Sequence, residues 1–91
     1  MAVDTKTFEA ALKRDGFSQI ETNGYAPGHQ TAEHAHEFDV RALVLEGDIT
    51  IGSLGEAKSY RPGDVFALPA EQIHTETIGA SGVRFLYGRR G

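Results

Sequence analysis

Three histidines carry the chemistry that this sequence predicts most clearly. His34 and His36 are separated by one residue, so on a β-strand both side chains point to the same face. A third, His74, follows after glycine- and proline-containing turns that can fold the chain back on itself. Imidazole nitrogen is a common ligand of zinc, iron and nickel, and binds manganese less well. His34, His36 and His74 therefore predict one divalent metal site (Zn, Fe, Mn or Ni) in a β protein.

The elements that must position these histidines are short β segments. Apolar runs separated by glycine or proline predict strands over residues 17–25, 30–36, 40–45, 49–51, 58–60, 65–68, 74–78 and 83–87. A hairpin is expected at Glu46-Gly47-Asp48, and a second break at residues 79–82. Many short strands at regular spacing predict an all-β barrel or sandwich.

One helix is expected, over residues 5–14. Phe8 and Leu12 lie four positions apart and begin an apolar stripe on one helical face. We expect residues 1–16 to form a helical arm that packs on, or covers, a β-barrel of residues 17–91.

Composition narrows the class of protein. Ninety-one residues suit one domain, and 9 Lys and Arg against 13 Asp and Glu give a formal net charge of −4. That balance argues against nucleic acid or an anionic membrane as the main partner. The absence of cysteine excludes disulfides and thiolate metal ligands. With no secretory signal pattern and no apolar run long enough to span a bilayer, we expect a cytoplasmic protein.

The segment over residues 40–45 is apolar on both faces. Ala42 and Val44 share one face, whereas Leu43 and Leu45 share the other. An antiparallel strand with one face in water shows cleaner alternation. The second face must be covered by another sheet or by a second copy of the chain, and we expect a homodimer.

The spacing of these residues resembles the two conserved blocks of the cupin superfamily. The first block reads Gly, five residues, His-x-His, three or four residues, Glu, six residues, Gly. The second reads Gly, five residues, Pro-x-Gly, two residues, His. The residues that match are Gly28, His34, His36 and Gly47 in the first block and Gly63, Pro69 and His74 in the second. The resemblance implies a small double-stranded β-helix, the cupin or jelly-roll barrel, with His34, His36 and His74 as metal ligands.

The sequence departs from these blocks at three positions. The glutamate of the first block, a fourth metal ligand in cupins that use it, falls on Val40, which cannot bind a metal. Asp39 is next to it, and we expect it to be a turn residue or a partner of Arg41. In the second block Glu71 replaces the glycine, and Ile78 stands where the full block ends in an asparagine, four residues after the histidine.

Glu76 is the carboxylate best placed to substitute. It lies two residues beyond His74 and so faces the same side of that strand. It can complete the metal shell, act as a general base, or sit at the barrel mouth beside an outward arginine. Gln30 shares the parity of His34 and is expected in the pocket. The predicted apolar walls are Ala42, Val44 and Ile78.

The resemblance implies a fold more firmly than an activity, because cupins include dioxygenases, isomerases, decarboxylases, lyases, storage proteins and small-ligand sensors. We expect a metal-dependent enzyme of dioxygenase, isomerase or lyase type acting on a small organic molecule, with Glu76 moving the proton. Two alternatives stay open. One is a non-catalytic module that binds or senses a small molecule, and the other is a structural dimeric barrel with a vestigial site.

Overall fold

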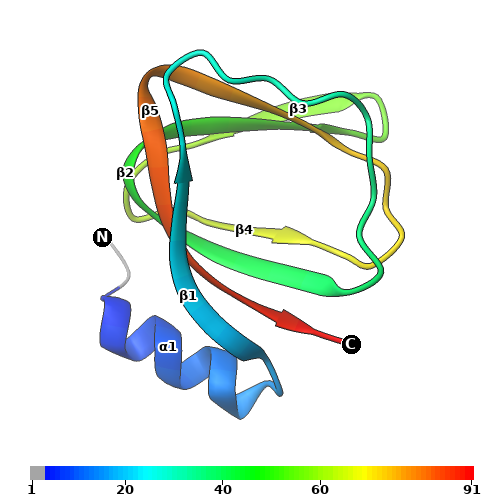
Figure 1. Cartoon of the computed structure of the whole chain (residues 1–91). Coiled ribbons are helices and arrows are strands. Elements are labelled where there is room, and N and C mark those ends of the chain that lie inside the picture. The colour runs from blue at the N-terminus through cyan, green and yellow to red at the C-terminus, as the bar shows by residue number, and fades with distance from the viewer. Residues whose placement is uncertain (1–3) are drawn as a thin grey trace.

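The computed structural model describes residues 4–91, which form one helix and a five-stranded antiparallel sheet (Figure 1). The elements are α1 (Thr5–Arg14), β1 (Ser18–Tyr25), β2 (Asp39–Ser53), β3 (Glu56–Tyr60), β4 (Val65–Leu68) and β5 (Thr75–Arg90). The strand order is β1-β5-β2-β3, and β4 pairs with β2. An all-β chain with one short N-terminal helix is therefore confirmed, with the helix at the predicted bounds.

β2 and β5 are long strands that pair along most of their length and bend together at the left of Figure 1. Both predicted breaks within them are wrong, because β2 continues through Gly47 and β5 continues through residues 79–82. Gly47 has a φ of +73° and lies so close to the Gly82 carbonyl that a Cβ would overlap it. The pairing register shifts on both sides of Gly47. Left-handed glycine here marks a bulge and a bend rather than a hairpin.

The strand predicted over residues 30–36 is also wrong. This segment makes only two isolated bridges to the chain around β5, Gln30 opposite Thr77 and His34 opposite His74. The chain bends between the bridges, so a continuous ladder does not form. The loop nevertheless runs beside β5, so that His34 lies opposite His74.

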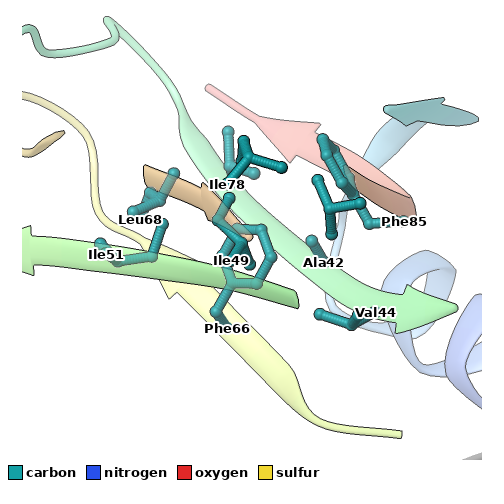
Figure 2. Close-up of a cluster of buried hydrophobic side chains, with 10 residues drawn as sticks. Ala42, Val44, Ile49, Ile51, Phe66, Leu68, Ile78 and Phe85 are labelled. Atoms are coloured by element: carbon teal, nitrogen blue, oxygen red, sulfur yellow. The ribbon is translucent and has the colours of Figure 1, made fainter. Parts of the chain in front are cut away.

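The main core lies between the inner faces of the folded sheet. Figure 2 shows side chains from β2, β4 and β5 pointing toward one another in this space. Its buried members are Val40, Ala42, Val44, Ile49, Ile51, Phe66, Leu68, Ile78, Val83 and Phe85. Alternate residues of β2 enter this core, as expected for a strand with a two-residue period.

A second core lies between α1 and the outer face of the sheet. Phe8 and Leu12 from α1 pack with Phe17, Leu43 and Leu86. The apolar outer face of β2 is thus covered by the chain's own helix, which removes the observation that favoured a second copy. The homodimer stays a prediction. No helix within residues 4–91 is long and apolar enough to cross a membrane.

Candidate metal centre

The structure brings the three predicted histidines and Glu76 to one point. One potential ligand atom from each of His34, His36, His74 and Glu76 lies within 4.8 Å of the other three. The ring centres of His34 and His74 are 4.3 Å apart, and that of His36 is 5.2 Å from each. These four side chains are called the His/Glu cluster below.

A backbone bridge positions two of the histidines. The amide of His34 donates to the carbonyl of His74 at 3.0 Å, and the amide of His74 donates to the carbonyl of His34 at 2.9 Å. Residues directly opposite in an antiparallel bridge place their side chains on the same face. The two imidazoles therefore lie side by side although they come from distant parts of the sequence.

Glu76 is held by the same loop. Its amide donates to the Thr31 hydroxyl at 3.0 Å, and the Thr31 amide donates to its carbonyl at 3.0 Å. The Glu76 side chain is buried, and its Oε2 lies 3.3 Å from His74 Nε2 and 3.7 Å from His34 Nε2. Glu76 is therefore inside the site with histidine neighbours, not at the rim beside an arginine.

The hydrogen bonds of the ring nitrogens define which atoms face the centre. His34 Nδ1 lies 2.9 Å from the Ala32 carbonyl, and His74 Nδ1 lies 3.1 Å from the Gln72 carbonyl. A carbonyl only accepts, so when each ring is neutral its proton lies on Nδ1 and its Nε2 is left as an acceptor beside Glu76. With both rings neutral, two Nε2 acceptors and a carboxylate oxygen converge on one point. Such a convergence of acceptors fits a cation.

The chemistry and the spacing of the donors both fit a transition metal. Imidazole nitrogen and carboxylate oxygen suit zinc, iron, nickel or manganese. Ligand atoms about 2.1 Å from one metal ion lie roughly 3–4 Å from each other. The 3.3 Å and 3.7 Å separations between Glu76 and the two Nε2 atoms agree with this. A metal-bound histidine usually donates its other ring N–H to a carboxylate, a backbone carbonyl or water, and a backbone carbonyl lies in that place at both rings here.

His36 completes the cluster from the loop that precedes β2. Its ring stacks on Phe38, with ring centres 5.1 Å apart and an interplanar angle of 15°. Burial lowers the pKa of His36, and the neighbouring His74 and His34 lower it further. A lowered pKa favours the neutral ring, which is the form that binds a metal.

The start of β2 contributes no carboxylate to the His/Glu cluster. Val40, at the place of the missing glutamate, is a buried wall residue of the cavity beside the cluster. Asp39 does not pair with Arg41: its carboxylate binds Arg90 Nη2 at 3.0 Å and accepts from the Ala70 amide at 2.8 Å. That amide and Arg90 lower the pKa of Asp39.

A cavity of about 140 Å³ adjoins the His/Glu cluster and reaches His36 and Glu76. Its walls are mostly apolar, with a few polar groups, which is typical of a small-molecule site. The apolar wall consists of Phe38, Val40, Ile49, Phe66, Leu68 and Phe85, and the other polar groups are Asn23, Tyr25, Tyr87 and Arg89.

The predicted lining residues were wrong in detail. Ala42, Val44 and Ile78 lie in the main core, and Gln30 is exposed on the loop. Sequence reasoning did not single out Tyr87 and Arg89, although their two-residue spacing after Phe85 indicates that all three share one face of β5.

Tyr25 lines the same cavity as Glu76 and feels its charge. Its pKa is raised by burial and by the negative charge of Glu76. The ring stacks on His29, with centres 4.9 Å apart and an interplanar angle of 7°. Tyr25 therefore keeps its phenolic proton at neutral pH and can donate it as a hydrogen bond.

Comparison with known proteins gives structural matches only. Neither a protein-family model nor a curated protein sequence matches the chain. A cupin superfamily protein from Desulfitobacterium hafniense is 26% identical, with a TM-score of 0.65, over 75% of this chain and 62% of that chain. The chain thus spans less than two thirds of that relative's length. Many other structural neighbours are cupin barrel or double-stranded β-helix proteins.

Two further neighbours differ in size and description. A protein of unknown function from Rhizobium leguminosarum is 20% identical, with a TM-score of 0.69, over 99% of this chain and 97% of that chain. A structure described as a DMSP lyase is 20% identical, with a TM-score of 0.71, over 79% of this chain and 37% of that chain. At these identities the matches establish a shared fold.

Proposed function

Because the protein has the double-stranded β-helix fold of the cupin superfamily, we propose that it is a metal-dependent enzyme that moves a proton on a small organic molecule. The metal is a divalent ion held by His34, His36, His74 and Glu76. The observation that carries the proposal is the convergence of the Nε2 atoms of His34 and His74 on Glu76 Oε2, with both Nδ1 atoms within hydrogen-bond distance of backbone carbonyls.

When bound, the metal supplies Lewis acidity, which polarises an oxygen of the bound molecule. The chain supplies the remaining parts of the site. Apolar walls exclude water from the cavity and strengthen the electrostatic interactions inside it. Tyr25 donates a hydrogen bond from a phenol that stays protonated, and Glu76 carries the buried negative charge beside it. Together they provide one proton donor and one proton acceptor in the same cavity.

The first experiment measures metal content. The purified chain is stripped with a chelator, loaded separately with Zn²⁺, Fe²⁺, Mn²⁺ or Ni²⁺, and analysed for bound metal. We expect about one ion per chain with at least one of these metals. The double variant His34→Ala, His36→Ala should lose it. The matched control is His29→Ala, because His29 is an exposed loop histidine outside the His/Glu cluster. Equal metal content in the double variant and the wild type would refute the metal site.

The second experiment separates an enzyme from a binding module. The metal-loaded chain is incubated in D₂O with a panel of short carbonyl compounds, and loss of C–H signals is followed by proton NMR. An enzyme of the proposed class exchanges these protons, and Tyr25→Phe should slow the exchange while metal content is kept. Binding without any exchange would instead favour the non-catalytic module.

A further inference from the structure

Among residues 4–91, Arg61 and Arg89 are the two arginines without an ion pair to a carboxylate, and Arg61 is exposed to solvent. Four arginines form ion pairs with carboxylates: Arg14, Arg41, Arg84 and Arg90. Within residues 4–91, Arg89 forms no such pair, and its Nε is buried without a hydrogen-bond partner. A buried donor that is left unsatisfied is costly, so the unpartnered Nε of Arg89 indicates a missing acceptor at the cavity wall.

The position of Arg89 is set by β5 and by stacking. Phe85, Tyr87 and Arg89 alternate along the strand and all line the cavity. The Arg89 guanidinium carbon lies 4.8 Å from the centre of the Phe38 ring. Phe38 in turn stacks on His36, with ring centres 5.1 Å apart. Arg89, Phe38 and His36 thus follow one another along the lining of one cavity, with Phe38 between the arginine and the His/Glu cluster.

The charge balance of the cavity favours an anion. Glu76 and Arg89 are the acidic and basic side chains in its lining. With a divalent ion in the His/Glu cluster, the metal and Arg89 together outweigh the single negative charge of Glu76. The apolar walls of the cavity favour a ligand with an apolar body.

The volume limits the size of that ligand. The cavity encloses about 140 Å³, and an apolar cavity of about this size accommodates a molecule such as benzene. Arginine presents a planar pair of N–H donors that matches a carboxylate.

We propose that the cavity binds a short-chain monocarboxylate, with its carboxylate on Arg89 and its other end at the His/Glu cluster. The assignment of the second end and the net positive charge of the cavity rest on the proposed function, whereas the Arg89 end stands on its unpartnered Nε in the cavity lining.

The test compares butyrate with butyramide, its uncharged analogue, on the full chain loaded with Zn²⁺. Affinity is measured by calorimetry, and metal content is measured on the same samples. We expect butyrate to bind about tenfold or more tightly than butyramide, and Arg89→Gln to lose about tenfold for butyrate only. Arg89→Lys keeps the charge and should retain part of the preference. Arg61→Gln is the matched control, because Arg61 is exposed and outside the cavity lining.

Three results would overturn the proposal. The first is unchanged butyrate affinity in a folded Arg89→Gln variant, and the second is equal or tighter binding of butyramide by the wild type. The third is inorganic phosphate displacing butyrate with higher affinity, which would make the site an oxyanion site of another class. A wild type that takes up no metal would refute the proposed function. Butyrate binding by the metal-free wild type and Arg89→Gln would then still decide the role of Arg89.

Discussion

The carboxylate of Asp15 lies 2.6 Å from the guanidinium of Arg41 and joins the end of α1 to β2. Arg14 binds the same carboxylate at 3.1 Å, and Arg90 donates to the Asp15 carbonyl at 2.9 Å. The Arg41 and Arg90 guanidinium groups also lie 4.5 Å and 4.6 Å from the centre of the Phe17 ring. The helix is thus attached to the barrel by charge as well as by its apolar stripe.

Acid should weaken this attachment. Hydrogen bonds from Arg14 and Arg41 lower the pKa of Asp15 from its usual 3.8 to about 2. A lowered pKa in the folded state means that ionised Asp15 stabilises the fold above about pH 4, and that this contribution is lost as the pH falls toward about 2. We expect Asp15→Asn to lower the urea midpoint at neutral pH and to show a smaller further loss in acid than the wild type.

The control for Asp15→Asn is Glu56→Gln, which changes an exposed carboxylate with no ion pair among residues 4–91. It should follow the wild-type curve. An acid-induced loss as large in Asp15→Asn as in the wild type would contradict the assignment.

The packing of α1 gives a second prediction. Leu12 is fully buried between the helix and the sheet. Leu12→Ala should therefore lower the free energy of unfolding by about 2–5 kcal/mol, measured by urea denaturation. Lys13→Ala, on the exposed side of the same helix, should cost only a few tenths of a kcal/mol, because it removes an exposed pair with Glu9. Similar losses for the two variants would mean that α1 is not a packed element.

The bend in β2 gives a third prediction. Gly47→Ala forces an alanine into a left-handed conformation and drives its Cβ into the Gly82 carbonyl. We expect a loss of stability severe enough to lower the yield of folded protein, read by circular dichroism and urea midpoint. Gly55→Ala is the matched comparison, since Gly55 has a φ of +79° but nothing within 4 Å of an added Cβ. It should cost about 1–2 kcal/mol from backbone strain alone.

Metal removal gives a fourth prediction. An ion that binds the folded chain only stabilises it, by about 2.7 kcal/mol when present at about a hundred times its Kd. Chelation should therefore lower the melting temperature of the wild type. The same treatment should lower the melting temperature of Glu76→Gln less, because a neutral amide oxygen binds a metal ion more weakly than the carboxylate that it replaces. A melting temperature that is indifferent to every metal tested would count against the site.

The sequence predicted those parts of the molecule that depend on local spacing. The apolar stripe at Phe8 and Leu12 was enough for the helix, and the positions of His34, His36 and His74 among glycines were enough for the cluster. The paths of β2 and β5 were harder to predict. A glycine such as Gly47 suits a hairpin and a bulge equally well, and the choice depends on what lies against it.

The cavity was the least predictable part. Whether Ala42 lines a cavity or fills a core depends on how far the sheet closes, which no local pattern reports. Strand alternation puts Arg89 and Arg90 on opposite faces of β5, but it does not say which of them has a carboxylate partner: Arg90 pairs with Asp39, and Arg89 faces the cavity. This difference depends on an ion pair between Arg90 and Asp39, which are distant in the sequence.

β5 has an irregularity of its own, because its pairing with β2 passes from Val83 opposite Gly47 to Ile78 opposite Ile49 and leaves residues 79–82 without partners in β2. Glu76 lies before residues 79–82 and Arg89 lies after them, on one continuous strand. A one-residue slip of the following stretch of β5 against β2 would turn Arg89 to the opposite face. Such a slip would bring a different side chain of β5 into the cavity. Ligand choice in this architecture can therefore change through strand register, without any substitution in the cavity wall.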